Sequence, residues 1–208
     1  MGEDPYAKMA KWYDMFTEPL ARKMRTKVVE AFIPPEGISV LDIGCGTGTQ
    51  LEIYQKAGCH ITGVELSPSM LDVAKAKLGK CARLYVADGA QLPFPNECFD
   101  VIVAFFIVHE MAESTRGKVI SEAKRVMKKD GRFLVIDYHV GPVPSWKGWV
   151  LRKVTFIAEY LAGGDHYRNF RHYMAKKGMP PLIEDSGLII EREVYFGGAG
   201  IMYVLALG

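Results

Sequence analysis

One short segment, Val40 to Gly48, constrains the fold of this chain more than any other. It reads Val-Leu-Asp-Ile-Gly-Cys-Gly-Thr-Gly, an apolar strand that runs into a turn with glycines at alternate positions and then into helix-forming sequence. Glycines let a backbone turn sharply and approach a ligand without Cβ atoms in the way, and the N–H groups of the next helix face the same place. The segment therefore predicts a site for a nucleotide-like cofactor.

The glycine spacing restricts the class of cofactor. The dinucleotide fingerprint G-x-G-x-x-G needs a later third glycine, whereas here Gly48 comes early and the bulky residues Gln50 and Leu51 follow. An NAD-dependent oxidoreductase is thus a disfavoured alternative. A P-loop is excluded because no Gly-Lys-Ser/Thr sequence follows to bind phosphate and magnesium.

Length and composition fit one soluble domain. The chain has 208 residues, of which 49% are hydrophobic and 24% charged, enough for a substantial core. The net charge of +2 is too small to indicate a nucleic-acid partner. The four cysteines have no C-x-x-C spacing, and the N-terminus has no apolar signal region, so we expect reduced thiols in a cytoplasmic protein. Nothing in the sequence fixes an oligomeric state.

Strands and helices alternate along the chain, which is typical of a parallel sheet with helices on both faces. Ser67 is expected to cap one helix and Ser114 another, and Asp130-Gly131 is expected to form a turn. The expected strands are 38–43, 60–65, 82–87, 99–104 and 132–138, and the expected helices are 6–32, 47–57, 70–78, 114–128 and 146–177.

The last two expected strands, 188–196 and 201–207, are joined by Gly197-Gly198-Ala199-Gly200. Such a short link permits a hairpin and no helical crossover, so the two strands should pair antiparallel. The predicted fold is α/β and Rossmann-like, with a seven-stranded, mostly parallel sheet, an antiparallel last strand and helices on both faces.

Acidic residues stand at the ends of the first three strands. Ligands of open α/β sheets bind beyond the carboxyl ends of the strands. Glu65 can accept hydrogen bonds from ribose hydroxyls, Asp88 can accept one from an adenine amine, and Leu66 can lie against the adenine face. One such acid alone is better explained as a helix cap, but together with the glycine turn these residues indicate a nucleoside site.

Cys45, inside the turn, allows two interpretations, a nucleophile or a small residue that fills the turn. We favour the second, because no histidine is adjacent in the sequence.

Several segments resemble the class I S-adenosylmethionine-dependent methyltransferases. Besides the glycine turn, the matching segments are 63–67, 87–94, 99–103 and 125–132, and Trp12-Tyr13-Asp14 resembles the segment that covers the cofactor. The resemblance implies a methyltransferase fold and S-adenosylmethionine as cofactor, with S-adenosylhomocysteine as product. It also implies that Asp42 supports the methionine end and that the glycines pass beside it. The expected cofactor-binding residues are Tyr13, Asp42, Gly44, Cys45, Gly46, Thr47, Gly48, Glu65, Leu66, Asp88, Gly89, Ala90 and Ala104.

The transfer of a methyl group from a sulfonium requires mainly that the acceptor be positioned and water kept out, so no metal is expected. A base is needed only where the acceptor loses a proton, as a phenol, a quinol or an activated carbon would. His109, after the fourth strand, and His139, at the end of the fifth, are the candidate catalytic residues. For both, a structural histidine is the competing interpretation.

The segment 163–171 is dense in polar residues and lies where methyltransferases usually insert substrate-binding helices. It suggests Tyr138, His166, Tyr167 and Arg168 as substrate-binding residues. Together with the glycine-rich stretch near the C-terminus, it resembles the quinone-biosynthesis (ubiquinone/menaquinone) C-methyltransferases and related small-molecule enzymes. The resemblance implies one domain, with an N-terminal helical cap at about 1–33 and an acceptor-binding helical insertion at about 141–180.

We expect a small or lipophilic acceptor, with a quinol as one candidate; the resemblance does not identify the substrate. A phospholipid or small-amine N-methyltransferase and a non-catalytic S-adenosylmethionine-binding regulator are the alternatives. The segment 145–162 reads as an amphipathic helix, with Trp146, Val150, Val154, Ile157 and Leu161 on one stripe. We expect a lid helix whose stripe packs on the domain. Peripheral contact with a membrane surface is the alternative.

Overall fold

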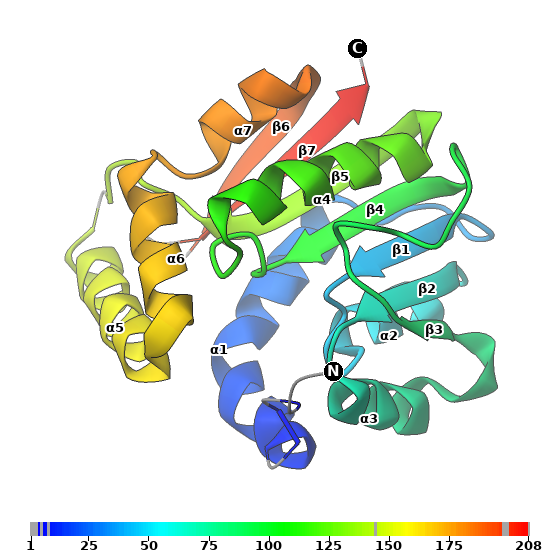
Figure 1. Ribbon diagram of the computed structural model, residues 1–208, viewed down its shortest axis with the longest axis horizontal. Coiled ribbons are helices and arrows are strands. Elements are labelled where there is room, and N and C mark those ends of the chain that lie inside the picture. The colour runs from blue at the N-terminus through cyan, green and yellow to red at the C-terminus, as the bar shows by residue number, and fades with distance from the viewer. Residues whose placement is uncertain (1–3, 5, 8, 144, 197–199, 208) are drawn as a thin grey trace.

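The chain folds around one twisted sheet with helices on both faces (Figure 1). The computed structural model describes residues 4, 6–7, 9–143, 145–196 and 200–207. Within these residues the strand order is β3-β2-β1-β4-β5-β7-β6. The strands are β1 Ser39–Ile43, β2 His60–Glu65, β3 Arg83–Val86, β4 Phe99–Phe105, β5 Met127–Tyr138, β6 Leu188–Phe196 and β7 Gly200–Leu207. The helices are α1 Ala10–Ala31, α2 Thr49–Lys56, α3 Pro68–Leu78, α4 Glu113–Val126, α5 Trp146–Ala162, α6 Gly164–Ala175 and α7 Met179–Ser186, with a 3₁₀ turn at Gly79–Cys81.

Strand directions confirm the predicted fold class. β1 pairs in parallel with β2 and β4, and the parallel pairing continues to β3 and β5. β7 pairs antiparallel with both β5 and β6. The expected antiparallel pairing of the last two strands is therefore confirmed, while most of the glycine-rich link between them, 197–199, lies outside the described residues.

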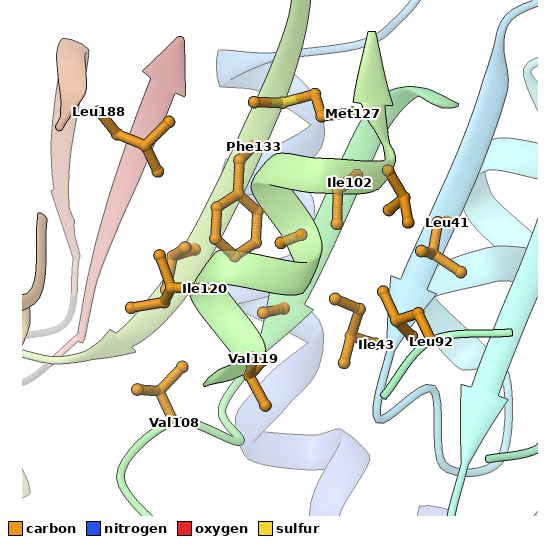
Figure 2. Packing of buried hydrophobic residues seen from close by; sticks show 14 of the residues in the cluster. Leu41, Ile43, Leu92, Ile102, Val108, Val119, Ile120, Met127, Phe133 and Leu188 are labelled. Atoms are coloured by element: carbon orange, nitrogen blue, oxygen red, sulfur yellow. The ribbon is translucent and has the colours of Figure 1, made fainter. Parts of the chain in front are cut away.

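The side chains of successive residues in each central strand lie on opposite faces of the sheet. In β4, Ile102 and Ala104 belong to one buried cluster, while Val101 and Val103 belong to the other. Figure 2 shows the first cluster, where Ile120 of α4 lies near Phe133 of β5. A strand buried on both faces must be apolar along its buried part, which is why β4 is apolar from Val101 to Phe105 and carries its one acid, Asp100, near its start.

Different helices cover the two faces. Residues of α4, α6 and α7 pack in the first cluster, and residues of α1, α2 and α3 pack in the second. The arrowheads of β1 and β4 point to the same edge of the sheet (Figure 1). The residues that follow these strands therefore gather at that edge.

One local prediction about helix α4 is wrong, one about α3 is confirmed, and the expected turn at Asp130-Gly131 falls within a strand. The cap residue of α4 is Ala112, without a side-chain hydrogen bond, and not Ser114. β5 already begins at Met127, and Asp130-Gly131 lies inside it. The register with β4 passes from the pair Met127–Phe99 to the pair Arg132–Val101, so residues 128–131 form an irregularity in the strand. Ser67 caps α3 as predicted, and its Oγ accepts a hydrogen bond from Met70 N at 3.1 Å.

The apolar stripe of α5 does not pack on the domain as expected. Thr155 and Glu159 form the buried side of this helix. The predicted stripe points to solvent, with Trp146 74% and Leu161 76% exposed, and Val150, Val154 and Ile157 are exposed as well. Among the described residues, no helix has both the length and the apolarity to cross a membrane.

Candidate active site

The glycine turn leaves an open backbone surface at the carboxyl end of β1. Gly46 has a φ of +53°, which L side chains rarely adopt, and a Cβ built there would meet nothing within 4 Å. Gly44 has a φ of +69°, and a Cβ there would lie 2.8 Å from Cγ2 of Ile107, in the loop after β4. The turn is thus open on one side, where a ligand can approach its backbone, and packed against the β4 loop on the other.

Asp42 supplies a buried carboxylate at this edge. Neither of its oxygens has a hydrogen-bond partner among the described residues. Burial raises the pKa of Asp42 to about 7, although the positive charge of Arg25 lowers it. A buried acid without partners fits a site completed by a ligand that carries a donor, such as the ammonium group of S-adenosylmethionine.

Glu65 lies beside the turn at the end of β2. Its Oε2 accepts a hydrogen bond from Gly46 N at 3.1 Å, and its Oε1 accepts one from Ser67 N at 2.9 Å. These contacts place the carboxylate next to the open turn, and its contact with a ribose stays a prediction. Asp88 and Leu66 are exposed at the same sheet edge, and Asp88 Oδ1 accepts a hydrogen bond from Ala90 N at 2.8 Å. Their contacts with adenine stay predictions.

The packing of Cys45 agrees with its interpretation as a small residue that fills the turn. A Cβ on Gly63 would lie 2.6 Å from its Sγ, so the thiol lies against the backbone of β2. Burial also raises the pKa of Cys45, which disfavours the thiolate that a nucleophile needs.

The N-terminal residues bind to the edge of the sheet that carries the glycine turn and Glu65, which we call the cofactor edge. Asp14 of α1 accepts a hydrogen bond from Thr47 Oγ1 at 2.5 Å and pairs with Lys77 of α3 at 2.6 Å. Asp4 accepts hydrogen bonds from Ser67 Oγ at 2.8 Å and Ser69 N at 3.0 Å, at the start of α3. These bonds hold the N-terminal segment over the ends of β1 and β2.

Tyr13 lies on α1 directly before Asp14, whose carboxylate binds Thr47 of the glycine turn. Burial raises the pKa of Tyr13 to about 12, and the negative charge of Glu110 contributes in the same direction. Its contact with a bound cofactor stays a prediction.

His109 and Asp137 form a buried pair at the carboxyl ends of β4 and β5. Nδ1 of His109 lies 2.7 Å from Asp137 Oδ1, and the histidine is 2% exposed. The oxygens of Asp137 also accept hydrogen bonds from the backbone N–H groups of Val108, His109 and Tyr138. Burial lowers the pKa of His109, but the charge and hydrogen bond of Asp137 outweigh it and raise the pKa to about 9.

Glu159 of α5 joins this pair to two predicted substrate residues. Its Oε1 accepts a hydrogen bond from the Tyr138 hydroxyl at 3.0 Å, and its Oε2 lies 2.5 Å from Nε2 of His166 on α6. Nε2 of His109 lies 3.6 Å from Glu159 Oε1. We call His109, Glu110, Tyr138, Glu159 and His166 the acceptor-side cluster.

Aromatic rings surround this cluster. The ring centroids of Tyr138 and Phe106 are 5.0 Å apart, those of Tyr138 and Phe170 are 5.6 Å apart, and those of His109 and Tyr138 are 4.7 Å apart. The cluster is thus a polar centre with apolar walls. Since Ile107 of the same loop packs on Gly44, it also adjoins the glycine turn.

Three of the predicted residues lie apart from the cluster. His139 is buried beside Tyr195, with ring centroids 5.2 Å apart, in a hollow of about 160 Å³. Arg168 is exposed and pairs with Asp165, while Tyr167 packs against Tyr160 with centroids 5.3 Å apart. Their roles toward a substrate stay predictions.

Two residues of the site, Asp137 and Glu159, were not predicted from the sequence. Asp137 directly precedes Tyr138, but its carboxylate is directed to the β4 loop 28 residues away in sequence. Glu159 lies in an apolar segment whose stripe drew attention to the opposite helix face. The polar residue inside that apolar helix was the available signal.

Comparison with known proteins agrees with this geometry. The family described as "Methyltransferase domain" matches residues 41–135, from β1 through most of β5. The demethylmenaquinone methyltransferase of Thermotoga maritima is 27% identical over 94% of this chain and 92% of its own length. The phosphatidylethanolamine N-methyltransferase of Cereibacter sphaeroides is 34% identical, over 52% of this chain and 54% of its own length. The chain spans about half the length of several other curated relatives that it matches.

Solved structures agree at the level of the fold. A SAM-dependent methyltransferase from Aquifex aeolicus superposes with a TM-score of 0.66 at 22% identity, covering 94% of this chain and 97% of that one. The segment that matches the methyltransferase family, residues 41–135, contains the glycine turn, Glu65 and the loop after β4. With this fold, this turn and these relatives, the chain belongs to the class I S-adenosylmethionine-dependent methyltransferases.

Proposed function

We propose that this enzyme methylates a lipophilic, hydroxylated ring of the quinol class, bound between the glycine turn and the acceptor-side cluster. The observation that carries the proposal is the cluster itself, a set of proton-accepting side chains inside aromatic walls next to the cofactor edge. A flat apolar ring fits the aromatic walls, and its hydroxyl group would contact the polar centre.

The reaction balances without a further reactant. A ring carbon or oxygen attacks the methyl carbon of S-adenosylmethionine, the carbon–sulfur bond breaks, and the electron pair stays on sulfur as S-adenosylhomocysteine. The ring hydroxyl loses its proton to the carboxylate of Glu159, which Tyr138 and His166 orient, while His109, held by Asp137, lies beside it as the cation that its raised pKa favours. Where a ring carbon attacks, that carbon then loses its own proton and the ring oxygen is protonated again. The aromatic walls exclude water from the reacting centre.

The proposal can be tested with a panel of acceptors, whose methylated products are detected by mass spectrometry. Reduced short-chain demethylquinols, simple catechols, ethanolamine and phosphatidylethanolamine would each be incubated with S-adenosylmethionine, and both the methylated product and S-adenosylhomocysteine measured. We expect turnover of the quinols. Turnover of the amines alone would contradict the proposal, and cofactor binding without turnover of any acceptor would favour a regulator.

A phospholipid or amine N-methyltransferase is the second candidate. Carboxylates among aromatic rings also suit a cationic headgroup, and Glu110 and Glu159 both lie near His109, whose ring contacts those of Tyr138 and Phe170. An amine needs no base once it is neutral, so this activity should survive His109→Ala, whereas quinol methylation should not.

We also propose that α5 lies on an anionic membrane surface while a lipophilic acceptor enters. Its apolar stripe is exposed, and Lys147 and Lys153 lie 5.8 and 5.2 Å from the ring centroids of Trp146 and Trp149. A helix with tryptophans, an exposed apolar stripe and flanking cations suits the interface of anionic lipids.

Vesicle flotation tests this contact with a matched pair of substitutions. Ile157 of α5 and Ile189 of β6 are 59% and 57% exposed, so replacement by Asp alters a similar area at two places. Ile157→Asp should reduce binding to phosphatidylglycerol vesicles, and Ile189→Asp should not. Equal binding of wild type to phosphatidylcholine vesicles, or equal losses in both variants, would contradict the proposal.

A further inference from the structure

We propose that His109, Glu159 and His166 form a binding site for one divalent transition-metal ion. One ligand atom from each of these side chains lies within 4.8 Å of the others. Two imidazoles and one carboxylate are the ligand set of many open metal sites that keep positions free for a substrate or water. The binding itself depends only on these residues; its role in catalysis rests on the function proposed above.

The imidazole of His109 is prepared for this role by its partner. Its Nδ1 is held by Asp137, whose position is fixed by three backbone N–H groups. Nε2 is directed at Glu159 Oε1 and Glu110 Oε1, at 3.6 and 3.8 Å, both beyond hydrogen-bond length. A buried imidazole with one nitrogen on a carboxylate and the other aimed at further ligand atoms is the usual arrangement of a metal-binding histidine.

The distances fit an ion after a small adjustment. Metal–nitrogen and metal–oxygen bonds of about 2.1 Å place two tetrahedral ligand atoms about 3.4 Å apart. The separation of His109 Nε2 and Glu159 Oε1 is 3.6 Å. The contact of 2.5 Å between His166 Nε2 and Glu159 Oε2 would open as the ion replaces the shared proton. Rotation of the partly exposed His166 side chain on α6 can provide that movement.

The local charge also favours a cation. Three carboxylates, Glu110, Asp137 and Glu159, converge on the two imidazoles. The guanidinium of Arg116 is directed to the backbone carbonyls of Val108, His109 and Asn169 and not to these carboxylates. A divalent ion would balance this excess of negative charge. It would also polarise a ring hydroxyl, which deepens the function proposed above.

Titration of the metal-free enzyme with Co²⁺ tests the site directly. After treatment with a chelator, we expect about one Co²⁺ per chain, with the visible absorption of a nitrogen-ligated ion, and displacement by Zn²⁺. His109→Ala, His166→Ala and Glu159→Gln should each weaken the affinity at least about 100-fold, and Asp137→Asn about 10-fold.

His172→Ala is the matched control, because His172 lies on the same helix as His166 but faces Arg116 and Glu113. It should bind Co²⁺ as wild type does. Retained affinity for S-adenosylhomocysteine would show that each variant is folded. Absence of stoichiometric Co²⁺ binding, or equal binding by folded His166→Ala and wild type, would overturn the inference.

The metal result and the acceptor result can be separated. Quinol methylation that persists in a chelator, in an enzyme that binds no Co²⁺, would refute the metal site and leave the proposed function intact. If the enzyme methylates no quinol but binds metal, and the three variants lose that binding, the metal site would stand and the proposed function would be refuted.

Discussion

The cofactor edge and the acceptor-side cluster are built in different ways. The cofactor edge is assembled from short segments that follow β1 and β2, with backbone groups of the glycine turn as its main feature. The acceptor-side cluster unites side chains from β5, α5, α6 and the β4 loop. A local turn can be predicted from the spacing of residues in the sequence. A cluster of side chains from distant elements depends on how those elements pack, which the spacing does not reveal.

The difference implies separable functions. Changes at the glycine turn should act on cofactor affinity, and changes in the cluster should act on turnover. A single substitution that changed both cofactor affinity and turnover would contradict this separation of functions.

Gly46→Val should have the largest effect. The valine side chain would occupy the open face of the turn and would need a φ of +53°. We expect cofactor affinity to fall at least about 100-fold by calorimetry with S-adenosylhomocysteine.

Gly79→Val is the control for backbone strain. Gly79 has a φ of +67° and also open space around its Cβ position, but it lies at the C-cap of α3. This variant should lose stability and keep its affinity. If both variants kept the affinity while folded, the placement of the cofactor on the turn would be wrong.

Glu65→Ala should have the next largest effect. Loss of a carboxylate that accepts hydrogen bonds from ribose should cost about 2 kcal/mol, which is roughly 30-fold in affinity. Asp88→Ala should cost less, about 1 kcal/mol, because Asp88 is exposed and screened by water. Asp72→Ala, an exposed acid on α3 that pairs with Lys75, should leave the affinity unchanged.

Asp42 should give the cofactor-free protein a pH-dependent stability. Its pKa is raised from 3.8 to about 7 on folding, so the folded state binds the proton more tightly than the unfolded state. The free energy of unfolding should therefore fall as the pH rises from about 4 to about 7. Urea unfolding of wild type and Asp42→Asn across this range should show a steeper fall for wild type. Parallel curves would show that Asp42 ionises normally in the fold.

The sequence predicted the sheet and the place of the glycine turn well for a physical reason. The apolar run of β4 and the glycines after β1 are local signals, each sufficient to define a strand or a turn. The residues beside them, such as Glu65, follow from the rule that ligands meet the carboxyl ends of parallel strands.

The errors arose where long-range contacts decide. Asp130-Gly131 reads as a turn before a strand, but β5 already begins at Met127, which pairs with Phe99 ahead of an irregularity at residues 128–131. The stripe on α5 was expected to face the domain, but the domain takes the side with Thr155 and Glu159 instead. Glu159 is stable there because Tyr138 and His166 satisfy its carboxylate, and neither partner is visible from the helix sequence.

Tyr138→Phe should have the smallest effect and tests whether the cluster acts on turnover alone. The substitution removes the hydroxyl that donates to Glu159 and keeps the ring against Phe106 and Phe170. Loss of one hydrogen bond to a carboxylate, at about 1 kcal/mol, should lower kcat roughly 5-fold on a quinol and leave cofactor affinity unchanged. Tyr195→Phe removes a comparable Tyr–Glu hydrogen bond to Glu193, at the surface, and should change neither quantity. A loss of cofactor affinity in Tyr138→Phe would mean that the two regions are coupled, because one hydroxyl on the acceptor side would then be felt at the glycine turn.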